Sequence, residues 1–218
     1  MSLFDPDSPL MEALTFVGRL ILVNLCFLVC CIPVVTVGAA CTALYTVTLA
    51  QAENRDMTSA LRKFFEAFKS NFRQSAVLWL IMLAFGILLY FDFRAVTVGP
   101  FADNRLMSVL LVIGAVCYIP TLTFLFPVQA KFDNRIFNTL KNALALGFAK
   151  FPQMLLMAAL NLLPVIILYI SPVFFFRIII LWILVACAAT AQLNSYILRR
   201  IFRKLIPPET EDDKGDAL

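Results

Sequence analysis

The segment ALRKFFEAFKSNFRQSAVLWLIMLAFGILLYF (residues 60–91) changes character at residue 75. Before that point, apolar and charged residues recur with the spacing of an amphipathic helix. From residue 75 to residue 91 no side chain is charged, and a bilayer span needs about 20 mostly apolar residues. The two patterns together predict a membrane protein that carries a basic amphipathic helix next to a span.

The basic part of this segment has two distinct helical faces. Its apolar residues fall at the i, i+3, i+4, i+7 and i+11 positions, and its polar residues lie on the opposite face. The apolar face consists of Leu61, Phe64, Phe65, Phe68 and Phe72, and the polar face consists of Arg62, Lys63, Glu66, Lys69, Ser70 and Arg73.

The composition of the whole chain agrees with this prediction. Of its 218 residues, 61% are hydrophobic and only 15% are charged, and the mean hydropathy is +0.88. A soluble domain of this length would need more polar surface to cover its core. The apolar runs are continuous rather than alternating, which argues against a transmembrane barrel. We therefore predict an all-α polytopic membrane protein.

Six apolar runs are the candidate spans, and the first two leave an alternative open. The runs cover residues 14–32, 34–50, 75–91, 106–128, 153–170 and 178–196. Residues 14–50 form either two spans with a tight turn near Pro33 and Gly38, or one broken helix, which would give five spans. We expect residues 1–205 to form one helical bundle and the acidic tail 206–218 to be disordered.

The distribution of Lys and Arg predicts the orientation. With six spans and an internal N-terminus, the inner segments 51–73, 131–152 and 197–218 hold fourteen of these residues, and the outer loops hold three. Positively charged loops stay on the cytoplasmic side. We therefore predict a multi-pass protein of the bacterial cytoplasmic membrane with both termini in the cytoplasm.

Two parts of the chain resemble each other at an offset of 79 residues. Thr42 then lies over Thr121, and Phe72 lies over Phe151. The second part also contains an amphipathic stretch, whose apolar residues are Phe137, Leu140, Leu144, Phe148 and Phe151. These matches suggest an internal duplication. Each copy consists of a span, an amphipathic inner helix and a second span, and the two copies have the same orientation, as in transporters built from parallel repeats.

Five stretches carry a family resemblance. They are FDPDSPLM (4–11), CIPVVTVGAACTALY (31–45), FFEAFKSNFRQ (64–74), FPVQAKFDN (126–134) and LKNALALGFAKFPQ (140–153). In order and spacing they resemble the YesL-like bacterial membrane proteins. The resemblance implies a cytoplasmic-membrane protein of the kind commonly encoded beside carbohydrate ABC importers, and it supplies no catalytic residues.

The residue inventory predicts no enzyme, no metal site and no cofactor. The chain has no histidine, no Walker lysine in a glycine-rich loop and no nucleophile elbow. Its six cysteines all fall within predicted spans and lack the Cys-x-x-Cys spacing. The net charge is +4, and the basic residues lie between the apolar runs. This position indicates that they interact with anionic lipid headgroups rather than with nucleic acid.

The two amphipathic stretches have two interpretations. They either lie in the headgroup layer or dock a cytoplasmic partner, such as the subunits of a carbohydrate ABC importer. The docking interpretation gives a set of partner-binding residues. These are Arg62, Lys63, Phe64, Phe65, Phe68, Lys69, Phe72, Arg73, Lys141, Phe148 and Lys150.

The rival function is a small transporter or channel for a sugar-related solute. Polar residues and prolines within spans can line such a pathway, because proline frees backbone carbonyls of the helix. The candidate pathway residues are Asn24, Pro120, Pro127 and Asn161. The sequence identifies neither the substrate nor the oligomeric state.

Overall fold

The structure is a computed structural model, and it describes residues 9–54, 59–99, 104–132 and 134–205. Within these ranges the chain is helical and contains no strand. The helices are α1 (Pro9–Cys30), α2 (Val37–Ala52), α3 (Ala60–Thr97), α4 (Arg105–Lys131), α5 (Ile136–Ala149), α6 (Phe151–Ile170), α7 (Pro172–Arg177), α8 (Ile179–Leu181) and α9 (Cys187–Leu205). The 3-10 helix η1 (Val34–Thr36) precedes α2, and the π-helix η2 (Trp182–Ala186) precedes α9.

The fold is that of a polytopic helical membrane protein, as the sequence predicts. Five helical segments are long and apolar enough to cross a membrane: Val34–Ala52, α3, α4, α6 and Ile179–Leu205. A sixth apolar helix, Leu14–Cys30, is shorter. Each of the six predicted spans therefore corresponds to a helix in the described part of the chain. The predicted disordered tail, residues 206–218, lies outside the described residues.

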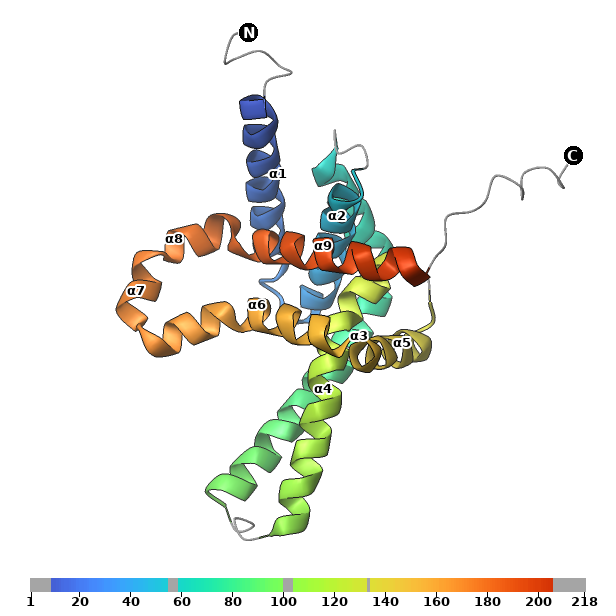
Figure 1. Cartoon of the computed structure of the whole chain (residues 1–218), viewed down its shortest axis with the longest axis vertical. Coiled ribbons are helices and arrows are strands. Elements are labelled where there is room, and N and C mark those ends of the chain that lie inside the picture. The colour runs from blue at the N-terminus through green and yellow to red at the C-terminus, as the bar shows by residue number, and fades with distance from the viewer. Residues whose placement is uncertain (1–8, 55–58, 100–103, 133, 206–218) are drawn as a thin grey trace, which may run out of the picture.

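Residues 14–50 form two helices rather than one broken helix. α1 and α2 run in opposite directions, and the turn between them contains η1 (Figure 1). Polar groups hold this uncharged turn in place: the Thr36 hydroxyl donates to the carbonyl of Pro33 at 2.7 Å, and the Trp79 indole donates to the carbonyl of Val34 at 2.8 Å. Side chains of the protein therefore supply hydrogen bonds to backbone carbonyls of this tight turn.

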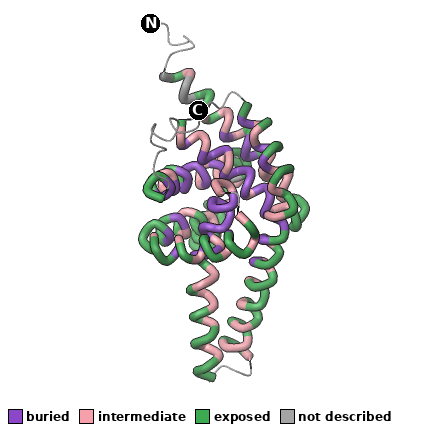
Figure 2. Tube along the Cα trace, turned by 90° about the vertical axis from the view of Figure 1, so that its right-hand side faces the viewer, coloured by how far each residue is buried: buried purple, intermediate pink, exposed green. Residues whose placement is uncertain are grey.

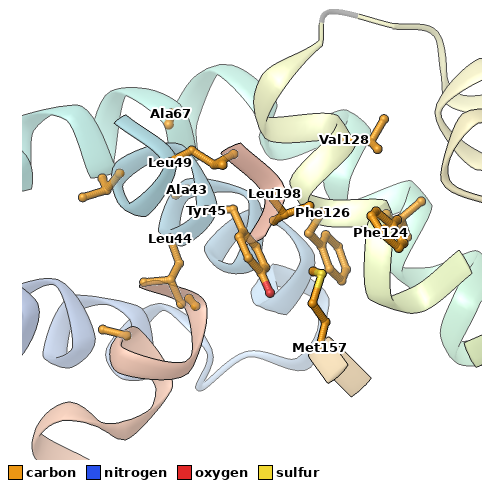
Figure 3. Packing of buried hydrophobic residues seen from close by; sticks show 14 of the residues in the cluster. Ala43, Leu44, Tyr45, Leu49, Ala67, Phe124, Phe126, Val128, Met157 and Leu198 are labelled. Atoms are coloured by element: carbon orange, nitrogen blue, oxygen red, sulfur yellow. The ribbon is translucent and has the colours of Figure 1, made fainter. Parts of the chain in front are cut away.

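α2 is the central helix of the molecule. Eleven of its sixteen residues are buried. The buried residues of the chain concentrate in the middle of the molecule, and the described residues of the two ends and of the long hairpin are mostly exposed or intermediate (Figure 2). Small residues such as Ala39, Ala40 and Ala43 are fully buried and allow neighbouring helices to approach closely. Tyr45 and Leu49 pack in the same cluster as side chains of α3, α4, α6 and α9 (Figure 3).

α3 corrects one expectation. The sequence predicts a separate amphipathic helix followed by a span, but residues 60–97 form one continuous helix of 38 residues. At 1.5 Å per residue this helix is about 57 Å long, almost twice the roughly 30 Å hydrocarbon core of a bilayer. The helix continues because charged residues on one face do not interrupt the backbone hydrogen bonds, and no proline or glycine stands at the change of pattern.

The second amphipathic stretch does form a separate helix. α5 ends at Ala149 and α6 begins at Phe151, with Lys150 in a non-helical conformation between them. Pro152 accounts for the break, because proline donates no backbone hydrogen bond and its ring clashes with the preceding turn. At the offset of 79 residues, Pro152 corresponds to Arg73 in the continuous helix α3.

The helix order supports the internal repeat. α2 followed by α3 corresponds at this offset to the second half of α4 followed by α5 and α6. Burial also agrees, since Phe64 and its counterpart Ala143 are both fully buried, as are Leu78 and Met157. The two units therefore place equivalent positions in the core.

Two hairpins leave this core in different directions (Figure 1). One consists of the second half of α3 and the first half of α4, and the other consists of α6, α7, α8, η2 and the start of α9. Arg105 lies near the tip of the first hairpin and Arg177 near the tip of the second. Most other described Lys and Arg residues lie on the first half of α3, on α5 and on the second half of α9. We call this region the basic end.

Candidate partner-binding surface and intramembrane cavity

In the first half of α3, the centre of the apolar face packs into the core. Phe64 is fully buried, and Ala60 and Ala67 on the same face are buried beside it. Phe68 packs against this core and lies 6.4 Å from Phe64, measured between ring centroids. The prediction that Phe64 contacts a partner is therefore wrong, because the core already covers its side chain.

The edge of the same face remains exposed. Phe65 is 50% exposed and Phe72 is 38% exposed. The cations Lys69 and Arg73 are exposed on the same half of the helix. Arg62 is also exposed, but its Nε donates to Glu66 Oε1 at 2.7 Å, and this contact raises the pKa of the guanidinium. Lys63 is half-buried.

α5 packs through a face that the sequence analysis did not predict. Its buried residues are Thr139, Ala143 and Gly147, spaced four apart, and Gly147 faces Pro120 of α4. The large apolar residues of the predicted amphipathic face, such as Phe137 and Phe148, are 76% and 46% exposed, which leaves them free to contact lipid or a partner. Small residues at every fourth position are the usual signal for close helix packing in membranes, and that signal was present in the sequence.

A hollow of about 750 Å³ lies between α3 and α5. Its lining includes Arg73 and Val77 of α3 together with Arg135, Ile136 and Phe137. The predicted residues Lys141 and Phe148 are exposed elsewhere on α5 and do not line it. We call the hollow, with the exposed residues Phe65, Lys69 and Phe72, the α3–α5 surface. Arg135 belongs to this surface although the sequence analysis did not single it out.

A polar network lies beside the hollow and connects α3, α4 and α5. Gln74 Nε2 donates to Gln129 Oε1 at 3.1 Å, and Thr139 Oγ1 donates to the same oxygen at 3.1 Å. Gln129 Nε2 in turn donates to Asn71 Oδ1 at 3.3 Å. Because Gln129 is buried and bonded to both neighbouring helices, the network fixes α5 relative to α3.

Lys150 lies in a different place from the other predicted partner-binding residues. It lines a cavity together with Arg200, Arg203 and Lys204 of α9 rather than the hollow beside α3. The predicted set of cations is therefore divided between two sites on the basic end.

A second cavity, of about 360 Å³, lies inside the bundle among α1, α2, α4, α6, α7 and α9. Its polar lining includes Tyr45, Thr123, Asn161 and Thr190. Asn194 Nδ2 donates to the Tyr45 hydroxyl at 3.2 Å and to Asn161 Oδ1 at 2.9 Å. The Oδ1 atom of Asn194 is buried without a hydrogen-bond partner. These groups could bind the hydroxyls of a small uncharged solute.

The four predicted pathway residues do not lie together. Asn161 lines the intramembrane cavity, but Asn24, Pro120 and Pro127 do not. Pro120 and Pro127 are buried within α4, and Pro120 packs against Gly147.

Asn24, a polar residue within a span, hydrogen-bonds to the backbone of the last predicted span. Its Nδ2 donates to the carbonyl of Ile183 at 2.7 Å, and its Oδ1 accepts from the N–H of Ala188 at 2.8 Å. Ile183 belongs to the π-helix η2, and Ala188 follows it at the start of α9. Asn24 therefore supplies hydrogen bonds where the sixth predicted span departs from regular α-helix.

The described residues contain no group of three His, Cys, Asp or Glu side chains placed to hold a metal ion. The cysteines at positions 26, 30, 31, 41, 117 and 187 are free thiols. The side chains at the sites described above offer amides, hydroxyls, aromatic rings and cations.

Comparison with known proteins supports the family resemblance. Residues 20–93 match the family described as "Protein of unknown function, DUF624". The chain is also 28% identical over 141 residues to the "Uncharacterized protein YesL" of Bacillus subtilis (strain 168). Over the aligned residues the chain is similar to YesL. The alignment covers 63% of this chain and 65% of the B. subtilis protein, so this chain spans just under two thirds of that relative.

The match to the DUF624 family covers most of the first repeat unit. It includes much of α1, all of α2 and most of α3, and thus the exposed residues Phe65, Lys69 and Phe72. No solved structure matches the chain.

Proposed function

We propose that this YesL-like chain is a non-enzymatic membrane protein that binds a protein partner through the α3–α5 surface. The proposed partner is a carbohydrate ABC importer, and the proposed location is the bacterial cytoplasmic membrane. The positive-inside rule supports a cytoplasmic location for the basic end, and with it for the α3–α5 surface.

The observation that carries this proposal is the mixture of aromatic and cationic side chains on the exposed edge of α3. A helix that lies in the headgroup layer buries its whole aromatic face in lipid and points its cations to the opposite side. Here the core covers Phe64, so Phe65 and Phe72 remain at the edge of the face, near Lys69 and Arg73. Aromatic residues and arginine are the residue types that contribute most to protein–protein binding.

The hollow beside α3 supports the same proposal. It brings Arg73 and Arg135 together with the exposed ring of Phe137, from two helices that the Gln129 network holds in place. A concave and pre-organised surface loses little entropy when a partner helix or loop binds. The importer itself is suggested by the family context that the resemblance implies, and by the common use of short cytoplasmic segments of permeases to contact ATPases.

A co-purification experiment tests the proposal. The tagged chain is expressed with the permease and ATPase subunits of a carbohydrate importer from the same genome, extracted in mild detergent and purified. We expect the importer subunits to co-purify, and the variant Lys69→Glu/Arg73→Glu to retain about tenfold less of them, because charge reversal at a binding hot spot costs more than 1 kcal/mol. Sugar uptake should fall in cells that carry this variant.

The variant Arg177→Glu is the matched control, because it also reverses an exposed cation but lies at the tip of the opposite hairpin. It should co-purify as the native chain does. Absence of importer subunits from the native sample, or equal recovery with Lys69→Glu/Arg73→Glu, would reject the importer as partner.

The intramembrane cavity favours a second candidate function, a small transporter for an uncharged polar solute. The supporting observation is the cluster of Tyr45, Asn161 and Asn194 next to a cavity of about 360 Å³. Purified protein in liposomes should then transport a radiolabelled sugar unaided, and Asn161→Leu should slow transport while Asn142→Leu, on the exposed surface of α5, should not. No transport by the native protein would reject this candidate.

A further inference from the structure

A third cavity lies between the start of α6 and the end of α9, and it is strongly basic. Its volume is about 690 Å³. Four of its lining side chains are cations: Lys150 at the start of α6, and Arg200, Arg203 and Lys204 on the last two turns of α9. These elements lie side by side at the basic end (Figure 1).

Within the described residues of this half of the chain, no acidic side chain balances these charges. Residues 134–205 contain eight Lys and Arg residues and no Asp or Glu. The ion pairs Arg62–Glu66 and Lys131–Glu53, both formed by other elements, involve none of the cations that line the cavity. Four like charges around one cavity repel each other, and an anion bound among them removes that repulsion and accepts charge-assisted hydrogen bonds.

The start of α6 adds to the positive potential. α6 has 20 residues, and Gln153 in its first turn lines the cavity next to Lys150. The first turn of a helix carries partial positive charge because its N–H groups have no partner within the helix. The charged side chains and the helix therefore favour an anion at the same place.

One wall of the cavity is apolar and continues onto the lipid-facing surface. Leu156 of α6 lines the cavity and is 53% exposed, and Tyr196 of α9 lines it and is 43% exposed. Leu155 next to Leu156 is 51% exposed. A free anion would make no favourable contact with this apolar wall, whereas the acyl chain of a lipid would bury it.

We propose that this cavity binds an anionic phospholipid. The phosphate lies among Lys150, Arg200, Arg203 and Lys204, and an acyl chain lies along Leu156 and the exposed face of α6. The proposal is independent of the importer, because the cavity shares no residue with the α3–α5 surface.

The test titrates purified, full-length protein in a non-ionic detergent with three probes: dihexanoylphosphatidylglycerol, dihexanoylphosphatidylcholine and inorganic phosphate. We expect phosphatidylglycerol to bind at least tenfold more tightly than the other two, as measured by isothermal titration. The variant Arg200→Gln/Arg203→Gln/Lys204→Gln should bind it about a hundredfold more weakly, at roughly fivefold for each cation near a lipid headgroup.

The variant Arg62→Gln/Lys69→Gln/Lys141→Gln is the matched control, since it removes the same charge from exposed positions of α3 and α5. Its affinity should stay within twofold of the native value. If the triple α9 variant fails to fold, Arg203→Gln alone should weaken binding about fivefold. Equal binding of phosphatidylcholine, or of inorganic phosphate, would overturn the proposal, and so would equal losses in the two triple variants.

Discussion

At the scale of single residues, two glycines stand where helices approach closely. Gly38 of α2 faces Ser75 and Trp79 of α3, and Gly147 of α5 faces Pro120 of α4. A Cβ atom added to Gly38 would lie 2.6 Å from the Cβ of Trp79, and one added to Gly147 would overlap the ring of Pro120. Since lipid and apolar side chains are equally apolar, such close packing is a main source of helix association in a membrane.

We therefore predict that Gly147→Ala and Gly38→Ala each destabilise the protein by about 1–3 kcal/mol, the usual cost of overpacking a filled interface. Gly18→Ala is the control, because a Cβ at Gly18 of α1 meets no atom within 4 Å. It should be neutral or stabilise by up to about 1 kcal/mol through helix propensity. Thermal unfolding in detergent measures all three, and an unfolding temperature for Gly147→Ala equal to that of Gly18→Ala would contradict the packing.

At the scale of elements, α3 and its counterpart α5–α6 show what local pattern can and cannot predict. The sequence predicted both amphipathic stretches and both spans because hydrophobic periodicity depends on the helix itself. The pattern does not predict that α3 is continuous, because a change from charged to apolar residues is typical of a boundary between two elements. The break before α6 follows from one residue, Pro152, whose counterpart in α3 is Arg73.

A proline placed at the corresponding position of α3 should reproduce the break before α6. Arg73→Pro should interrupt α3 and destabilise the protein by about 3 kcal/mol or more, because proline removes a helical hydrogen bond and clashes with the preceding turn. Arg73→Ala is the matched control and should be nearly neutral, since Arg73 is exposed. Circular dichroism and thermal unfolding compare the two variants. If Arg73→Pro unfolds at the same temperature as Arg73→Ala, the helix is not continuous at this position.

At the scale of the whole molecule, the number of spans could be predicted but their arrangement could not. With η1, α2 is long and apolar enough to span a membrane, as α3, α4 and α6 are, and length and composition alone do not reveal that it is the central helix. For the same reason Phe64 could not be distinguished from Phe65, although one is fully buried and the other is half exposed. The basic cavity joins Lys150 to residues of α9 about fifty positions later, and no local pattern brings them together.

The orientation of the molecule gives the last prediction. Fourteen Lys and Arg residues lie on the predicted inner segments and three on the outer loops, and positively charged segments are retained in the cytoplasm. In a chain without its native cysteines, Val173→Cys and Leu106→Cys, at the two hairpin tips, should react with a membrane-impermeant maleimide in intact cells. Asn142→Cys on α5 and Lys204→Cys on α9, which are exposed at the basic end, should react only after permeabilisation. Labelling of Asn142→Cys in intact cells would place the α3–α5 surface outside the cell, where no cytoplasmic subunit of an importer could bind it.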